Sequence, residues 1–379
     1  MKESVFGFSL RTEILFGIGA LENLSLEFSN RRWRSALIVT DQGIRQTGLL
    51  SQLEGVLRAN GVEYRIYNGV IPNPTVQVVE EATRLAKSFN PDVLIGFGGG
   101  SSLDAAKVVN ILKTHSGTVF DYEGGETVPG SCGPLVAIPT TAGTGSEVTQ
   151  FAVVSDPKRK IKMPIASKFI MPDLAVVDPN LSATMPPKLT AATGMDALTH
   201  AIESMTSLAE QPLTDILSLK AIRLIVENLP KAMQNGGDME ARASMAFASL
   251  IAGISLSNSY VGVAHSIAHA LGGLYDLPHG VCCALALPVA MEYNLAVKRN
   301  KYEQIAEALG VSAPEEGIEK VRELNNEIGM PSGLKALGAR EDEIEKIAER
   351  ALADGSTLFN PRQPTKEDML ELVGKLLES

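Results

Sequence analysis

The sequence predicts a two-domain protein, with an α/β domain over residues 1–182 and an all-α domain over residues 183–379. Three observations predict this fold class. The chain has 379 residues, which exceeds the size at which a single hydrophobic core stops growing. In the first half, short apolar runs alternate with helical patterns, whereas the second half shows almost only helical periodicity.

Three apolar runs in the first half are typical of buried parallel strands. They are "SALIVTD" (35–41), "DVLIGFGGG" (92–100) and "LVAIP" (135–139), and each is closed by Asp, Gly or Pro. Between the runs, "TGLLSQLEGVLRAN" and "TVQVVEEATRLAKSFN" place apolar residues at helical spacing. The order of these elements indicates βαβ units, and hence a doubly wound, Rossmann-like parallel sheet.

The domain boundary is expected between Leu181 and Pro187, where two prolines in "MPPKLT" can precede a helix but cannot lie in its interior. After it, the helical segments are "KLTAATGMDALTHAIESM", "LTDILSLKAIRLIVENLPKAM", "YEQIAEALG", "EDEIEKIAERAL" and "KEDMLELVGKLLE".

Composition and charge restrict the partners and the location. With 45% hydrophobic and 21% charged residues the chain has the composition of a globular protein, and its net charge of −10 argues against general binding to nucleic acid or an anionic membrane. The start lacks the apolar core of a signal peptide, and three cysteines form no disulfide framework. We therefore expect a cytoplasmic protein.

One long uncharged stretch must be tested as a membrane span. Residues 243–275 contain no Asp, Glu, Lys or Arg, which exceeds the roughly 20 residues that a spanning helix needs. The stretch also carries six serines, Asn258 and two histidines. Helices buried on all sides explain this composition better than a membrane span.

A glycine-rich loop is a candidate phosphate site. "PDVLIGFGGGSSLDAAK" places glycines at the end of a predicted strand and then Ser101 and Ser102 at the start of a helix. Backbone amides and the helix dipole at this point favour an anion such as the pyrophosphate of a dinucleotide. The motif spells G-x-G-x-x-S rather than G-x-G-x-x-G, so a tight strand-to-helix turn without a ligand is the alternative.

A carboxylate for the ribose of that dinucleotide is expected at Asp41. Asp41 ends the strand "SALIVTD", where it could bind the ribose hydroxyls and repel a 2′-phosphate, which favours NAD over NADP. The alternative role for Asp41 is a simple helix or turn cap. Asp121 has the usual spacing from the glycines, but it lies in a loop-like stretch.

Five polar residues of the second half, one aspartate and four histidines, predict a metal site. In "GMDALTHAIE", Asp196 and His200 are four residues apart, and therefore share one face of a helix. His265 and His269 repeat this spacing, and His279 follows the helix-breaking "DLPHG". One carboxylate and three imidazoles could hold a divalent cation with a position open for substrate. Spacing alone leaves open whether His265 or His269 coordinates, and hydrogen-bonded core packing is the alternative for each histidine.

Taken together, the motifs resemble those of the iron-dependent (group III) alcohol dehydrogenase family, which includes lactaldehyde reductase and 1,3-propanediol dehydrogenase. The matching stretches are "GGGSSLDAAK", "IPTTAGTGSEVT", "GMDALTHAIE", "HSIAHALGG" and "PHG", in family order across both domains. The resemblance implies a nucleotide-binding α/β domain, a helical metal domain and an active site in the cleft between them.

The resemblance also implies roles for individual residues. It places the metal ligands at Asp196, His200, His265 and His279, and it places His269 beside the metal and near the nicotinamide. There, His269 or a bound water is expected to relay the proton. The implied cofactor contacts are Asp41, Asn73, Gly99, Gly100, Ser101, Ser102, Thr140, Thr141, Thr149, Lys162, Leu181 and His269.

The implied reaction is reversible hydride transfer between NAD(H) and a primary alcohol or short diol and its aldehyde. The implied metal is Fe²⁺, with Zn²⁺ as the alternative because the same ligands bind it more tightly. The implied assembly is a homodimer or a larger homo-oligomer. Three other functions remain open: a lyase of the dehydroquinate synthase type, a metal hydrolase without a dinucleotide, and a binding protein without catalysis.

Overall fold

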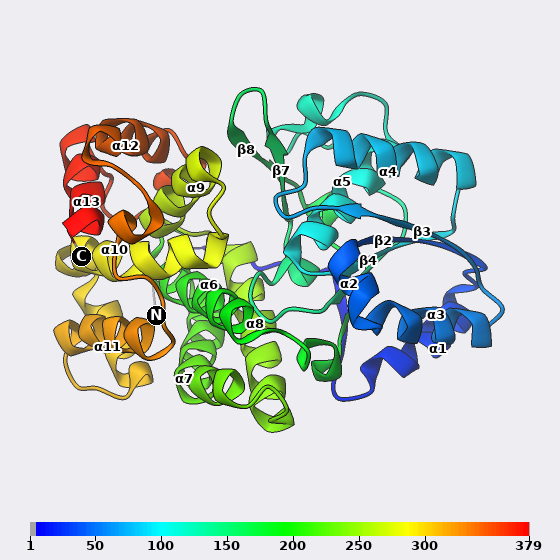
Figure 1. Cartoon of the computed structure of the whole chain (residues 1–379), viewed down its shortest axis with the longest axis horizontal. Helices are drawn as coiled ribbons and strands as arrows, with labels where there is room; N and C mark the ends of the chain where they lie inside the picture. The colour runs from blue at the N-terminus through cyan, green and yellow to red at the C-terminus, as the bar shows by residue number, and fades with distance from the viewer. Residues whose placement is uncertain (1–4, 379) are drawn as a thin grey trace. The chain divides into compact units, whose positions relative to one another are not determined.

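The structure is a computed structural model that describes residues 5–378. Its contacts divide the chain into two compact units, which are described separately (Figure 1). Among the described residues, one unit comprises residues 10–184, and the other comprises residues 185–378 together with residues 5–9.

The first unit is built on a six-stranded sheet in which every neighbouring pair is parallel. In spatial order the strands are β1 (Glu13–Phe16), β9 (Leu174–Val177), β6 (Leu135–Pro139), β4 (Val93–Gly98), β2 (Ser35–Asp41) and β3 (Glu63–Val70). The helices are α1 (Ala20–Arg31), α2 (Gln42–Thr47), α3 (Leu49–Ala59), α4 (Val76–Phe89) and α5 (Gly100–Thr114). A second, smaller sheet contains β5 (Gly124–Gly125), β8 (Ile161–Ala166) and β7 (Phe151–Asp156).

This architecture confirms the predicted doubly wound parallel sheet. The three predicted strands appear as β2, β4 and β6, which are interior strands, and this position explains their continuous apolar runs. Leu37 of β2 packs with α4 and α5, and its neighbour Ile38 packs with α1 and α3, so helices cover both faces of the sheet (Figure 1). Strands β1, β3 and β9 and the small sheet were not predicted from the sequence.

The strand order creates a switch point between β2 and β4. From β2 the chain goes to β3 on one side and returns to β4 on the other. Because all six strands are parallel, the ends of β2, β4 and β6 at Asp41, Gly98 and Pro139 lie along one edge. Ligands of such sheets bind at the carboxyl edge, beside the switch point.

Two charged side chains inside the first unit fix a loop to α5. The partly buried carboxylate of Asp104 accepts hydrogen bonds from Ser146 Oγ at 2.6 Å and from the Val153 amide at 2.9 Å. The ammonium of Lys107 donates to the carbonyls of Thr149 and Phe151, at 2.9 and 2.7 Å. Helix α5 therefore holds residues 146–153 through the hydrogen bonds of two charged side chains. Each of these side chains is largely removed from water but has hydrogen-bond partners.

The second unit is helical, as predicted. Its helices are α6 (Pro187–Thr206), α7 (Pro212–Gln234), α8 (Met239–Ser259), α9 (Val263–Tyr275), α10 (His279–Leu309), α11 (Pro314–Glu327), α12 (Ile344–Leu352) and α13 (Lys366–Glu378). Short 3-10 helices connect elements in both units: η1 (Val119–Tyr122), η2 (Ser146–Val148), η3 (Lys168–Ile170), η4 (Pro179–Ser182), η5 (Leu334–Leu337), η6 (Glu341–Glu343) and η7 (Gly355–Phe359). Pro187, one of the two prolines expected at the boundary, is the first residue of α6.

The long uncharged stretch forms α8 and α9, which meet at an angle of 102°. Most of its side chains are buried, as expected for helices enclosed by other helices. Helix α10 is also long and apolar enough to cross a membrane, but 72% of its apolar window is buried inside the protein. These helices form the core of the helical unit.

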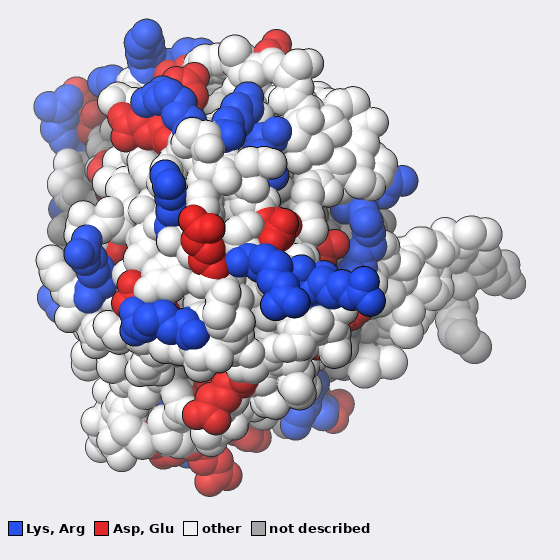
Figure 2. Space-filling model, turned by 90° about the vertical axis from the view of Figure 1, so that its right-hand side faces the viewer, with Lys and Arg blue, Asp and Glu red and all other residues white. Residues whose placement is uncertain are grey.

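Surface charge is mixed on the face that Figure 2 presents, where lysine and arginine side chains alternate with aspartate and glutamate. The net charge of −10 is therefore not expressed there as one continuous acidic surface.

The first prediction concerns Glu147. Burial raises the pKa of its carboxyl to about 7, although Lys107 acts in the opposite direction. A carboxyl with a raised folded-state pKa contributes stability that is fully present below its unfolded-state pKa of about 4.3 and is lost as the pH rises through the folded-state value. Glu147→Gln removes this titration. Between about pH 4 and pH 8, we expect the free energy of unfolding of the wild type to fall by roughly 3 kcal/mol relative to that of the variant. Thermal unfolding of both proteins across this pH range measures the difference. Stability curves that run parallel for wild type and variant would contradict the prediction.

Candidate metal centre

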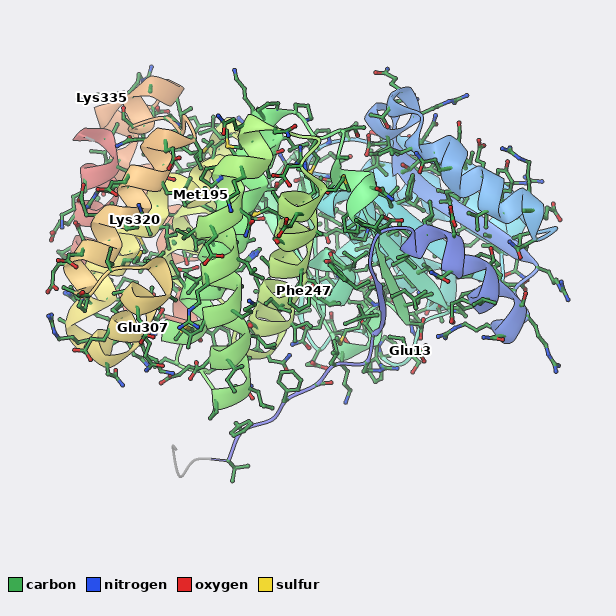
Figure 3. All side chains as sticks on the ribbon, turned by 90° about the horizontal axis from the view of Figure 1, so that it is seen from below. Glu13, Met195, Phe247, Glu307, Lys320 and Lys335 are labelled. Carbon is green, nitrogen blue, oxygen red and sulfur yellow. The ribbon has the colours of Figure 1, made fainter. Side chains whose placement is uncertain are left out.

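Helix α6 provides the first two residues of the centre. Asp196 and His200 lie one turn apart, and their side chains are almost completely buried. Met195, which precedes Asp196 and is labelled in Figure 3, is wholly buried. The closest approach of the pair is 3.5 Å, between His200 Nε2 and Asp196 Oδ1. The predicted sharing of one helix face is therefore confirmed.

Helices α9 and α10 provide the three other histidines. His265 and His269 lie one turn apart on α9, and His279 is the first residue of α10. Gly280 explains how α10 comes so near to α6, because a Cβ atom at this position would overlap the backbone carbonyl of Ala192. The missing side chain therefore lets the first turn of α10 carry His279 to Asp196.

Three imidazoles converge on one carboxylate oxygen. Asp196 Oδ1 lies 3.4 Å from His279 Nε2, 3.5 Å from His200 Nε2 and 3.7 Å from His265 Nε2. Metal–ligand bonds of about 2.0–2.2 Å place neighbouring donor atoms roughly 3.0–3.5 Å apart. The distance from Asp196 Oδ1 to each of the three nitrogens is therefore close to the spacing that one divalent cation requires, and the chemistry of the four groups suits a transition metal.

A carboxylate that the sequence analysis missed orients His265. Glu203 Oε2 lies 2.6 Å from His265 Nδ1, and Glu203 Oε1 accepts the Ala264 amide at 2.8 Å. Because the carboxylate accepts from Nδ1, the Nε2 atom of a neutral His265 keeps its lone pair for a metal. This buried Nε2 has no hydrogen-bond partner among residues 5–378. The available signal was the position of Glu203 seven residues after Asp196, two helical turns along the same face.

His269 has a different partner. Its Nδ1 lies 2.9 Å from Asp354 Oδ2, and its ring stacks on that of His279 with centroids 5.3 Å apart. Asp354 precedes η7 and also accepts the Ser356 amide. Burial acts to raise the pKa of Asp354, but His269 and these hydrogen bonds hold it below its usual value. His269 therefore lies beside the cluster, fixed by a second carboxylate.

The charge of the cluster is that of a cation site. Burial acts to raise the pKa of Asp196, but His200, His279 and His265 outweigh it and hold that pKa far below its ordinary value. Asp196 is thus a carboxylate enclosed by protein, and such a group is stable only beside positive charge or hydrogen-bond donors.

A thiol also reaches the cluster. Cys283 Sγ lies 3.6 Å from His279 Nε2 and 3.7 Å from Asp196 Oδ1, and burial raises the pKa of this thiol to about 11. From the sequence, Cys283 was considered only as one of three cysteines that form no disulfide framework. Its spacing of four residues from His279 was the signal that it lies on the same helix face.

In the first unit, the structure places Asp41 at the carboxyl end of β2 and beside the glycine loop. Asp41 Oδ1 accepts the Ile44 amide at 2.9 Å, so the alternative role as the cap of α2 is confirmed. Its second oxygen accepts from Ser102 Oγ at 3.2 Å, which joins the end of β2 to the first turn of α5. Asp121 instead accepts hydrogen bonds from Thr118 within its own loop.

The glycine loop has the expected strand-turn-helix form. Gly98 ends β4 with φ of +148°, and a side chain there would meet Ser102 Oγ at 2.6 Å. Gly99 is the N-cap of α5, so Gly100 and Ser101 belong to its first turn. The first amides of a helix have no partner within the helix, and here they lie at the carboxyl edge of the sheet.

The other predicted cofactor residues are spread more widely. Thr140 and Thr141 follow β6 next to the loop, since the Thr140 amide donates to Gly98 O at 2.9 Å. Thr149 is buried against Lys107, and Lys162 lies on β8. Asn73 follows β3 with φ of +53°. The side chain of Leu181 packs in the hydrophobic core, so it is not directed to a ligand.

Comparison with known proteins gives the family. The model "Iron-containing alcohol dehydrogenase" matches residues 11–179, and "Fe-containing alcohol dehydrogenase family, C-terminal" matches residues 190–377. Alcohol dehydrogenase 4 of Saccharomyces cerevisiae is 41% identical over 379 residues, 99% of each chain. NAD-dependent methanol dehydrogenase of Bacillus methanolicus is 39% identical over 371 residues, which cover 96% of this chain and 97% of that protein. A crystal structure of 1,3-propanediol oxidoreductase superposes with a TM-score of 0.95 at 37% identity and covers 99% of this chain and 100% of that one.

The fold and these similarities define an oxidoreductase that acts on alcohols. The chain belongs to the iron-containing alcohol dehydrogenase family. The resemblance found in the sequence motifs is thereby confirmed.

The second prediction tests the contact between α6 and α10. Gly280→Ala forces a methyl group against the Ala192 carbonyl and should lower stability by about 1–3 kcal/mol and weaken metal binding by displacing His279. The control is Gly374→Ala in α13, where a Cβ meets no atom within 4 Å and stability should stay equal or rise. Thermal unfolding and metal affinity by chelator competition provide the measurements. Wild-type values for both in Gly280→Ala would contradict the packing argument.

Proposed function

We propose that this protein catalyses reversible hydride transfer between NAD(H) and a short primary alcohol or diol and its aldehyde, and that Asp196, His200, His265 and His279 hold a divalent metal. The observation that carries this proposal is the convergence of three imidazole Nε2 atoms on Asp196 Oδ1, within 3.4–3.7 Å. Two relatives support the substrate class, since one is named a methanol dehydrogenase and the other a 1,3-propanediol oxidoreductase.

The metal proposed for this site is Fe²⁺, with Zn²⁺ as its competitor. Three imidazoles and one carboxylate suit either ion, and the name of the family supports iron. When bound, such an ion supplies Lewis acidity toward an alcohol or carbonyl oxygen, and NAD supplies the hydride acceptor. Glu203 keeps His265 Nε2 directed to Asp196, and this orientation strengthens metal binding.

His269 is proposed as the proton relay. With Nδ1 donating to Asp354, the Nε2 atom of the neutral ring is an acceptor for the proton that leaves the alcohol hydroxyl. In the reverse direction the same atom returns the proton to the forming alcohol. Asp354 therefore holds the His269 ring in one tautomer. Its carboxylate also stabilises the ring while the ring carries the proton and is positively charged.

NAD is proposed as the cofactor in preference to NADP. The first turn of α5, with Gly99, Gly100, Ser101 and Ser102, would bind the pyrophosphate through its amides. The carboxylate of Asp41, joined to Ser102, would accept from the ribose hydroxyls and repel a 2′-phosphate. The relative from Bacillus methanolicus is named as NAD-dependent. Asn73, Thr140, Thr141, Thr149, Lys162 and the backbone of Leu181 remain proposed contacts.

We also propose a homo-oligomer and a cytoplasmic location. Leu213 and Ile216 of α7 and Phe247 of α8 are exposed apolar side chains, as found at subunit interfaces. Phe247 is labelled in Figure 3. Light scattering tests the assembly, and a monomer at micromolar concentration would contradict it.

The cytoplasmic location is proposed from the cysteines. None of the three forms a disulfide in the described part of the chain, which accords with a reducing compartment.

The third prediction tests the proposed reaction. Protein purified without oxygen should contain about one equivalent of metal and should reduce NAD with short alcohols or diols. Removal of the metal, or His279→Ala, should abolish turnover but leave NAD affinity within about twofold, because the dinucleotide contacts lie elsewhere. Elemental analysis, an NADH assay and calorimetric titration measure these quantities. Undiminished turnover in a metal-depleted sample would refute the mechanism.

The fourth prediction tests cofactor choice. Asp41→Asn retains an oxygen for the Ile44 amide but removes the charge that repels a 2′-phosphate. We expect the ratio of kcat/KM for NADP to that for NAD to rise by at least about tenfold. The matched control is Asp92→Asn, whose carboxylate accepts the amides of Arg34 and Ser35 at the opposite end of β2. An unchanged ratio in Asp41→Asn, or an equal change in the control, would remove Asp41 from the ribose site.

A further inference from the structure

Cys283 is a potential metal ligand outside the four residues proposed above. It lies on α10, one turn after His279, and its side chain is completely buried. The ligand atoms of Asp196, His265, His279 and Cys283 all lie within 4.8 Å of one another. A thiol is therefore directed into the same cluster as a carboxylate and two imidazoles.

The distances around the sulfur agree with shared coordination. Cys283 Sγ lies 3.6 Å from His279 Nε2 and 3.7 Å from Asp196 Oδ1. A metal–sulfur bond of about 2.3 Å and a metal–nitrogen bond of about 2.0 Å place the two donor atoms roughly 3.1–3.6 Å apart. The sulfur thus needs to move by a few tenths of an ångström at most to share an ion with His279.

The neighbouring cysteine shows that the position of the thiol is specific. Cys282 has the same residue type, the same helix and the same complete burial. Among the described residues, however, the converging set contains Cys283 and not Cys282. Packing alone would account for a thiol at either position, but it does not account for a sulfur that meets two proposed metal ligands.

We propose that Cys283 binds the metal directly as a thiolate, in addition to Asp196, His200, His265 and His279. On binding, a sulfur–metal bond forms and the thiol proton passes to solvent. A sulfur donor is softer than the other four, so it shifts the relative affinity of the site from Fe²⁺ toward Zn²⁺ and Co²⁺. This inference rests on the proposed function, in that it requires a metal at this site.

Cobalt spectroscopy tests the proposal without an activity assay. The metal-free protein is loaded with Co²⁺, whose thiolate complexes absorb strongly in the near ultraviolet through sulfur-to-metal charge transfer. Wild type and the control Cys282→Ser should show this band, and Cys283→Ser should lack it at equal cobalt content. A band of wild-type intensity in Cys283→Ser, or wild-type protein with bound cobalt and no band, would overturn the proposal.

A second measurement tests selectivity and separates this inference from the proposed function. In Cys283→Ser the ratio of zinc affinity to iron affinity, measured anaerobically by chelator competition, should fall by at least about tenfold. An unchanged ratio would also overturn the role of Cys283. Bound cobalt without the band refutes only Cys283 as a ligand, whereas wild-type protein that binds no metal refutes the metal centre as well.

Discussion

The buried carboxylate of Asp196 is the constraint on which the helical unit depends. A charge enclosed by protein is costly unless positive charge or donors surround it, and here three imidazoles from α6, α9 and α10 approach one of its oxygens. Their helices must therefore meet at one point, which the absent side chain of Gly280 permits. Glu203 and Asp354 bind the Nδ1 atoms of His265 and His269, respectively, and these hydrogen bonds fix the orientation of each ring.

In the α/β unit the corresponding constraint is the carboxyl edge of a parallel sheet. The strand order brings the ends of β2 and β4 together, and the hydrogen bond from Ser102 to Asp41 joins the end of β2 to the first turn of α5, which follows β4. The bonds of Lys107 to Thr149 and Phe151 fix the polar loop that follows β6 against the same helix, α5. The amides proposed to bind the pyrophosphate and the carboxylate proposed to bind the ribose thus come from separate βαβ units at one edge.

The sequence could predict what depends on local spacing. Three of the four interior strands, β2, β4 and β6, were visible because burial on both faces makes them apolar throughout, whereas the short interior strand β9 was missed. The pair Asp196 and His200 was visible because helical geometry alone places them on one face. The contact of Asp354 with His269 could not be predicted, because 85 residues separate the two in the sequence and only the folded chain brings them together. Cys283 had the right spacing from His279, but spacing does not show where a helix face is directed. The family resemblance, not the spacing, separated His265 from His269, and the different partners of these rings support that assignment.

The central claim is that Asp196 is the anionic group around which a metal is held. Asp196→Asn keeps the size of the side chain and removes its charge, so its metal dissociation constant measures this claim most directly. Chelator competition on the variant should give an affinity for Fe²⁺ or Zn²⁺ weaker by at least about a hundredfold, with NAD affinity close to wild type. An Asp196→Asn protein that binds metal as tightly as wild type would contradict the account.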